Sequence, residues 1–175
     1  LLSRRQRQMC IRDSVMTGDN NRNRYLYYQL KLSMLHAKKI DIIVSFLMES
    51  GVRLILNDLK TALDRGVQIR ILTGNYLGIT QPSALYLLKN ELGNRVDMRF
   101  YNDKHRSFHP KAYIFHYENY EDIYIGSSNI SRSALTSGIE WNYRLNSQDN
   151  HKDFVLFYDT FQDLFENHST LTCLH

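Results

Sequence analysis

The order of apolar and polar positions divides the first hundred residues into alternating helical and extended segments. Leucines recur at helical spacing without glycine or proline in the first helical segment, and short apolar runs typical of buried strands separate the helices. Helices are expected at residues 25–39, 52–63 and 83–92, and strands at residues 41–47, 67–72 and 96–101. Arg65-Gly66 and Gly93 mark two of the helix ends. This alternation predicts parallel βαβ units.

The second half of the chain has a different pattern, in which strands follow one another through short links. Strands are expected at residues 108–117, 122–125 and 139–145, and a closing helix at residues 152–165. Short links favour antiparallel pairs. The predicted fold class is therefore α/β, with a mixed β-sheet sandwiched between helices.

Length and composition add the expectation of one globular domain. The chain has 175 residues, of which 43% are hydrophobic and 12% aromatic, enough to bury a core. Its two cysteines, Cys10 and Cys173, lie near opposite ends without metal-ligand neighbours, which argues against a disulfide scaffold or a zinc site. The same cysteine usage fits a reducing compartment, so we expect a cytoplasmic protein. No apolar run reaches the length of a membrane span and no signal peptide is visible, and we expect no membrane partner.

The net charge of +4 is concentrated at the N-terminus. Six arginines and two aspartates in residues 1–24 account for all of it, so the remainder is balanced and a DNA footprint has to come from local arrangement. Residues 1–14 resemble a translated sequencing adapter, and we expect them to be a disordered artefact rather than a basic arm for nucleic acid. Residues 15–175 are then one domain, expected to be a fragment of a longer protein.

The strongest chemical signal is a histidine and a lysine close together in an aromatic run. His109 and Lys111 are two residues apart, so in a strand both side chains point to the same face. Taken alone, a histidine such as His109 is more often a core residue, and a lysine such as Lys111 is more often a solvated strand residue. A lysine among apolar neighbours needs an anionic partner, and a substrate phosphate is one candidate.

A second cluster follows the next predicted strand. Gly126 opens a turn containing Ser127, Ser128 and Asn129, where small hydroxyls and an amide can hold phosphate oxygens. The same residues are common in ordinary turns, and Asn129 could cap a helix that starts near Ile130.

Two charged residues lie further along the chain. Glu140 could be an exposed strand carboxylate or orient a histidine, and Arg132 could bind phosphate or be surface charge. Trp141 is expected in the core.

These blocks resemble the signature of the phospholipase D superfamily, in which His-x-Lys is followed by Gly-Ser-x-Asn and a glutamate eleven residues past the asparagine, as Glu140 is here. Other segments resemble the nuclease-like branch found at the N-terminus of bacterial superfamily II DNA helicases and in some restriction endonucleases. Those segments are residues 42–46, 49–51, 64–67, 71–73 and 127–135, and the resemblance extends from about residue 25 to about residue 165. The family places an aspartate five residues after the lysine, whereas this chain has His116. The resemblance implies that this position supports the fold, so its loss puts local stability in doubt.

The resemblance implies a phospholipase D-like fold and a phosphodiesterase that uses neither metal nor cofactor. It implies that one histidine attacks phosphorus and a second protonates the leaving oxygen. The residues that it implies in catalysis are His109, Lys111, Ser127, Asn129 and Glu140, with Ser128 and Arg132 contacting substrate. The chain has one His-x-Lys block, so we expect a homodimer or a second copy elsewhere.

DNA is the preferred substrate and partner, because of the helicase-linked branch and because apolar surface segments for work on bilayers are not evident. A helicase module in the same natural chain, or a restriction or defence system, is the expected context. The alternatives are a non-catalytic DNA-docking module of a helicase and a phospholipase or phosphatidyl transferase.

Overall fold

The computed structural model describes residues 14–20, 24–167 and 171–173. Its strands form one eight-stranded sheet in the order β1-β7-β6-β5-β2-β3-β4-β8. The strands are β1 (Val15–Met16), β2 (Lys39–Val44), β3 (Gln68–Thr73), β4 (Val96–Tyr101), β5 (Lys111–His116), β6 (Glu121–Gly126), β7 (Asn142–Asn146) and β8 (Leu171–Cys173). The α-helices are α2 (Leu26–His36), α3 (Glu49–Asp64), α4 (Pro82–Leu92), α5 (Arg132–Thr136) and α6 (His151–Glu166), and short 3₁₀ turns lie at Tyr76–Gly78 and Gly93–Arg95.

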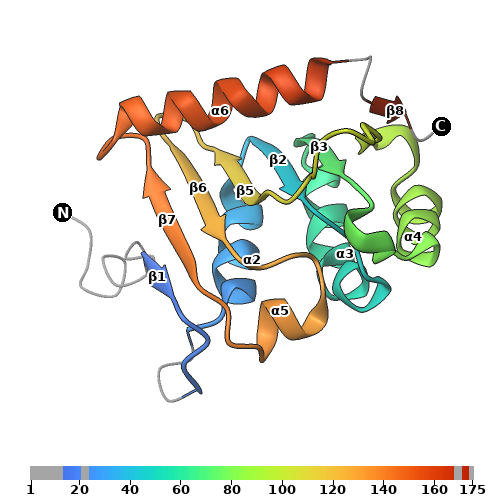
Figure 1. Ribbon diagram of the computed structural model, residues 1–175. Coiled ribbons are helices and arrows are strands. Elements are labelled where there is room, and N and C mark those ends of the chain that lie inside the picture. Colours follow the sequence, from blue (N-terminus) through green and yellow to red (C-terminus); the bar gives the residue numbers. More distant parts are fainter. Residues whose placement is uncertain (1–13, 21–23, 168–170, 174–175) are drawn as a thin grey trace.

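Parallel and antiparallel pairs are both present, as predicted. Strands β2, β3 and β4 are parallel, which places their carboxyl ends at one edge of the sheet. Strand β5 pairs antiparallel with β2, and β6 and β7 continue this antiparallel half. Helix α6 lies across one face of the sheet, and the other helices lie against the opposite face (Figure 1). The α/β class with a mixed sheet between helices is thereby confirmed.

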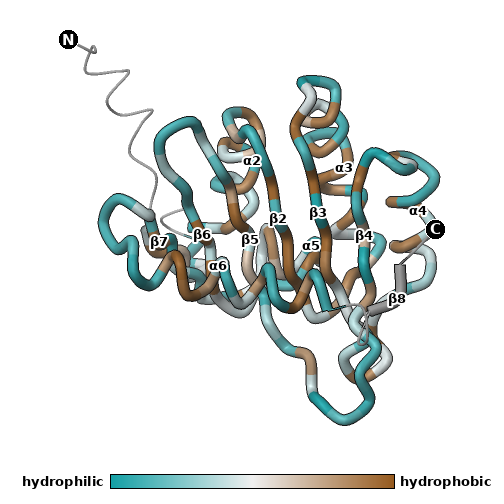
Figure 2. The backbone as a smooth tube through the Cα atoms, turned by 90° about the horizontal axis from the view of Figure 1, so that it is seen from above, coloured by the Kyte–Doolittle hydropathy of each residue, from teal (hydrophilic) through white to brown (hydrophobic). Residues whose placement is uncertain are grey.

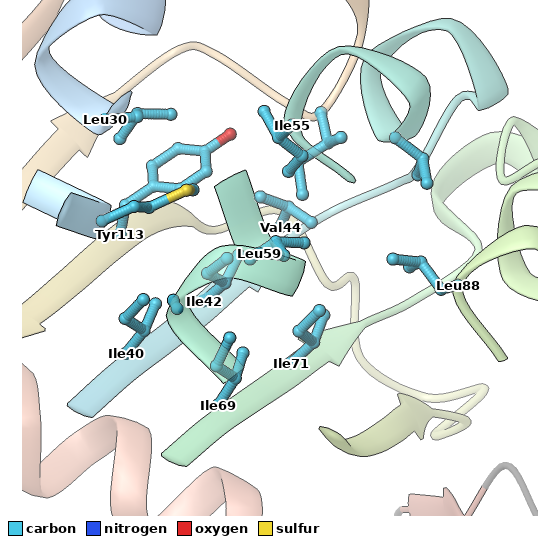
Figure 3. Packing of buried hydrophobic residues seen from close by; sticks show 14 of the residues in the cluster. Leu30, Ile40, Ile42, Val44, Ile55, Leu59, Ile69, Ile71, Leu88 and Tyr113 are labelled. Carbon is cyan, nitrogen blue, oxygen red and sulfur yellow. The ribbon is translucent and has the colours of Figure 1, made fainter. Parts of the chain in front are cut away.

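Alternation along β2 divides the core between the two faces of the sheet. Ile40, Ile42 and Val44 pack with residues of β3, α3 and α4 on one side (Figure 3), whereas Ile43 belongs to the cluster under α6. This is the period-2 pattern of a strand buried on both faces. Figure 2 shows hydrophobic positions on the central strands and hydrophilic positions in the surrounding loops.

A buried polar network joins three strands beneath α6. The Asp41 carboxylate is 0% exposed, and it accepts hydrogen bonds from Arg70 Nε at 2.5 Å and from His116 Nε2 at 2.8 Å. The Arg70 guanidinium also lies over the rings of Phe161 and Phe165 on α6. Burial alone raises the pKa of Asp41, but the bonds from His116 and Arg70 outweigh it and lower the pKa. His116 thus has a structural role at the position where the family carries an aspartate.

Several boundaries differ from those predicted, and the differences concern the site. The strand predicted over residues 108–117 begins at Lys111, because Pro110 has no N–H for the ladder and its carbonyl accepts from Ser45 Oγ at 3.1 Å. The strand predicted over residues 139–145 begins at Asn142, so Glu140 precedes it. Strands β1 and β8 were not predicted, since two- and three-residue strands carry no periodicity. Residues 1–13, most of the segment predicted to be an artefact, lie outside the described residues.

Candidate active site

The residues predicted to form the site meet at the carboxyl edge of the parallel strands. Val44, the last residue of β2, pairs with Lys111, the first of β5. One strand further on, Gly126 at the end of β6 pairs with Asn142 at the start of β7. The loop before β5 and the turn after β6 therefore leave the same edge of the sheet. Ligands of open α/β sheets commonly bind at such an edge.

His109 and Lys111 are in direct contact, as predicted. Lys111 Nζ lies 2.8 Å from His109 Nε2 and 3.1 Å from Nδ1, and it donates to the His109 carbonyl oxygen at 3.1 Å. Lys111 is only 9% exposed, whereas the His109 side chain is exposed at the surface. The reason differs from the prediction, because His109 precedes the strand and the lysine reaches back to it.

Two aromatic ring pairs and one close approach of a glycine hold the loop that carries His109. The Phe108 ring stacks on Tyr101 with centroids 4.5 Å apart, and a Cβ on Gly74 would come within 2.7 Å of the Phe108 ring. The His109 ring packs on Tyr76 with centroids 4.2 Å apart and planes tilted by 40°. Sequence reasoning missed the roles of Gly74 and Tyr101 in this support. The only available signal was a glycine directly after a buried strand.

The electrostatics of the pair favour a neutral imidazole beside a cation. Partial burial, and then the positive charge of Lys111, lower the pKa of His109 below its ordinary value. Burial also lowers the pKa of Lys111, and the nearby charge of Glu140 opposes that shift. A histidine with a lowered pKa has its lone pair free at neutral pH, as a nucleophile requires.

Ser127 and Glu140 form the second part of the site. Ser127 Oγ donates to Glu140 Oε2 and accepts from the Trp141 backbone N–H at 3.1 Å, and the serine is exposed. Gly126 makes this turn possible, because a Cβ there would lie 2.1 Å from the Trp141 carbonyl oxygen. Within the described part of the chain Glu140 does not hydrogen-bond to His109. Its predicted role in orienting a histidine stays a prediction.

Ser128 does not fit the substrate-binding role predicted for it. It is 0% exposed, and its Oγ donates to the Ala134 carbonyl at 3.2 Å and accepts from Asn142 Nδ2 at 2.8 Å. Its backbone carbonyl accepts from Tyr113 OH at 3.0 Å. The side chain is thus committed to joining the turn to α5 and β7, and substrate cannot reach it without breaking that structure. The sequence pattern could not distinguish two adjacent serines of which only one faces solvent.

Asn129 links the turn to the loop after β2. Its Oδ1 accepts from the Phe46 backbone N–H at 3.2 Å, and the residue is 5% exposed. The alternative role of Asn129 as a helix cap is excluded, because Ser131 is the N-cap of α5 and its Oγ accepts from Ala134 N at 3.2 Å. Asn129 therefore holds the β2–α3 loop against the site, and its contact with substrate stays a prediction.

Two other expectations concern the surroundings of the turn. Trp141 is 72% exposed, so its predicted place in the core is wrong. Arg132 is exposed at the start of α5. Burial raises the pKa of Tyr27 on α2, and the positive charge of Arg132 opposes that rise. The predicted contact of Arg132 with substrate stays a prediction.

An apolar cleft of about 460 Å³ lies between the sheet and α6 and reaches His109 and Lys111. Leu156 and Phe157 line it from α6 and are 67% and 47% exposed. The expectation that apolar surface is lacking is therefore wrong for this side of the molecule. No helix in the described residues has the length and hydropathy to cross a membrane. The described residues also contain no cluster of three or more His, Cys, Asp or Glu able to hold a metal ion.

Comparisons with known proteins agree with the fold. The family model described as "Cardiolipin synthase, PLD-like domain" matches residues 30–168. NucT from Helicobacter pylori superposes with a TM-score of 0.69 at 15% identity, covering 92% of this chain and 98% of that one. Nuc from Salmonella typhimurium, a phospholipase D family member, has a TM-score of 0.67 at 19% identity, with coverage of 93% and 98%.

A larger protein shares the fold as well. Phosphatidylserine synthase from Haemophilus influenzae has a TM-score of 0.65 at 16% identity, covering 91% of this chain and 38% of that one. No curated protein sequence matches the chain.

Proposed function

This chain belongs to the PLD-like domain family, and from that premise we propose that it is a metal-independent phosphodiesterase that cleaves DNA through a histidine nucleophile. The observation that carries the proposal is the contact between an exposed histidine and a buried lysine, His109 and Lys111, at 2.8 Å. A lysine buried beside a neutral imidazole has no carboxylate within ion-pair distance among the described residues. A bound phosphate would supply the missing negative charge.

The geometry supports a two-step reaction. In the first step a His109 ring nitrogen attacks phosphorus, the bond from phosphorus to the leaving oxygen breaks, and a phosphohistidine forms. A general acid gives a proton to the leaving oxygen. In the second step water attacks phosphorus, loses its proton to the same group, and the bond from phosphorus to nitrogen breaks. To Lys111 and Ser127 we assign the stabilisation of the charge that develops on the phosphoryl oxygens.

The general acid is the reason for proposing a homodimer. In the described part of the chain no second histidine contacts His109, whose ring meets only Lys111 and Tyr76. A twofold axis would bring a second His109 into the site without further sequence. Ile139, Trp141 and Tyr143 are 86%, 72% and 56% exposed around Glu140, and such apolar side chains are suited to an interface. The same axis would let Glu140 of one subunit orient His109 of the other.

DNA is proposed as the substrate on the sequence blocks shared with helicase-linked and restriction-type domains. A helicase module in the same natural chain, or a restriction or defence system, is the context that we propose. A cytoplasmic location is proposed on the two cysteines without metal-ligand neighbours, and a single domain over residues 15–175 is proposed on the length of the chain.

The apolar cleft supports a second candidate function. A cleft of about 460 Å³ that ends at His109 and Lys111 would suit an amphiphilic phosphodiester, with its apolar part under α6. A phospholipase or phosphatidyl transferase is therefore the alternative enzyme. A DNA-docking module without turnover is the non-enzymatic alternative.

Hydrolysis of bis(p-nitrophenyl) phosphate in excess EDTA tests the proposal. We expect turnover by the unaltered protein, and a loss of roughly 10³-fold or more in His109→Ala. His151→Ala removes another exposed histidine, at the start of α6, and serves as the matched control. Cleavage of DNA but not of phosphatidylglycerol vesicles would separate the first candidate from the second. Full activity in His109→Ala, or strict dependence on added magnesium, would reject the mechanism.

A further inference from the structure

A second groove opens beside the loop that carries His109. It has a volume of about 410 Å³ and lies between the loop after β3 and the loop after β4. Tyr76 and Leu77 line it from the first loop, Tyr101 lines it from the end of β4, and Lys104 and Arg106 line it from the second loop. Tyr76 also packs on the His109 ring, so the groove begins where the proposed chemistry takes place. A groove of this volume is within the range of small-ligand sites.

The groove combines an aromatic surface with unpaired positive charge. Lys104 and Arg106 are exposed, and neither forms an ion pair within the described residues. The one carboxylate in the groove, Asp103, is already engaged, since it accepts from the His105 backbone N–H at 2.8 Å and from Tyr101 OH at 3.5 Å. Two cations beside aromatic rings match the combination that binds the phosphates and bases of single-stranded nucleic acid.

The backbone next to Tyr76 is strained. Leu77 has φ 53° and ψ 22°, the left-handed conformation that branched and bulky residues rarely adopt. This conformation turns the leucine outward, where it is 79% exposed although it is apolar. Strain of this kind concentrates at ligand-binding segments. An exposed leucine beside an aromatic ring provides a flat apolar surface on which a base can rest.

We propose that this groove binds the nucleotide adjacent to the scissile phosphate of single-stranded DNA. The base stacks on Tyr76 against Leu77, and the neighbouring phosphate contacts Lys104 and Arg106. A paired and stacked base cannot reach the Tyr76 ring, so the groove favours single strands over duplex. This inference deepens the proposed function and rests on it, because it places the adjacent phosphate on His109.

Binding of a fluorescein-labelled deoxythymidine oligomer to the His109→Ala protein, which leaves the oligomer intact, tests the inference. An abasic oligomer of equal length retains the phosphates without the bases. Tyr76→Leu should weaken binding of the thymidine oligomer roughly five- to hundredfold, as expected from the loss of one stacked base, and leave the abasic oligomer unaffected. Tyr76→Phe keeps the ring and should retain the affinity. Tyr86→Leu on α4, where the tyrosine is 67% exposed, is the matched control.

The charged half of the groove has its own test. Replacement of both Lys104 and Arg106 by alanine should weaken both oligomers and lower the slope of log affinity against log salt by about 1.4. The double variant Lys31→Ala/Lys152→Ala removes two exposed cations elsewhere and should leave the slope unchanged. Equal affinity for single strands and duplex, or unchanged affinity in both groove variants, would overturn the inference.

These outcomes are separable from the proposed chemistry. Bis(p-nitrophenyl) phosphate carries no nucleobase, so a failure to hydrolyse it counts against the His109 mechanism alone. The affinities of the groove variants for the oligomers test the groove alone.

Discussion

Replacement of His116 by aspartate restores the residue that the family places at this position, yet it should destabilise this protein. His116 Nε2 donates to Asp41 Oδ2 at 2.8 Å, and Asp41 is 0% exposed. The His116 side chain is 15% exposed and packs edge-on against Tyr158, with ring centroids 5.0 Å apart. His116→Asp removes the donor and places a second carboxylate beside a buried one.

The magnitude follows from two losses and one partial compensation. Loss of a hydrogen bond to a charged group costs about 1.5–3 kcal/mol. Two carboxylates about 5 Å apart repel by about 3 kcal/mol at an effective dielectric constant of 20. The Arg70 guanidinium, which already bonds to Asp41 at 2.5 Å, offsets part of this repulsion. We expect a net loss of about 2–4 kcal/mol, or about 5–15 °C in the melting temperature of a domain of this size.

Thermal and urea unfolding at several pH values measure this effect. The pKa of the new aspartate is raised in the folded state by its neighbour, so the stability lost in His116→Asp should increase as pH rises above about 4. His116→Asn keeps a donor toward Asp41 and should lose only about 1 kcal/mol. Hydrolysis per folded molecule should be unchanged, because His116 and Lys111 are at opposite ends of β5. A His116→Asp protein as stable as the original at pH 7 would refute the reasoning.

Three other predictions follow from the site. In an NMR titration the His109 imidazole should have a pKa below its ordinary value, and Lys111→Met should raise it, because a neighbouring positive charge is removed; an unchanged titration would contradict this electrostatic coupling. Gly126→Ala should lower the melting temperature markedly and reduce activity, because its Cβ would meet the Trp141 carbonyl at 2.1 Å; normal folding of that variant would show that the turn can shift. Mixing His109→Ala subunits with unaltered subunits should reduce phosphodiesterase activity below the fraction of unaltered chains, and an active monomer in light scattering would reject the dimer.

Helices and long strands were predictable from periodicity, and the site was predictable only as a set of residues. The β2 run of isoleucines and valine identified a central strand because both of its faces are buried. The contact of His109 with Lys111 was also predicted from spacing, although the strand begins only at Lys111 and His109 precedes it.

The roles of individual turn residues depend on tertiary contacts that spacing does not encode. Ser127 and Ser128 are neighbours, yet one faces solvent and the other is buried behind Asn142. The support of Phe108 by Gly74 and Tyr101 joins three segments distant in sequence. Such contacts arise only when the sheet brings its edge loops together.

The most direct test of the central claim is detection of a covalent phosphohistidine. The protein would be mixed with bis(p-nitrophenyl) phosphate in EDTA, quenched in alkali within one turnover, and digested for mass spectrometry, since phosphohistidine is labile in acid. We predict a nitrophenyl phosphate adduct on the peptide that contains His109, and no adduct in His109→Ala. An adduct on another residue would contradict a histidine nucleophile at this site. So would a reaction that releases product without a burst and proceeds equally fast in His109→Ala.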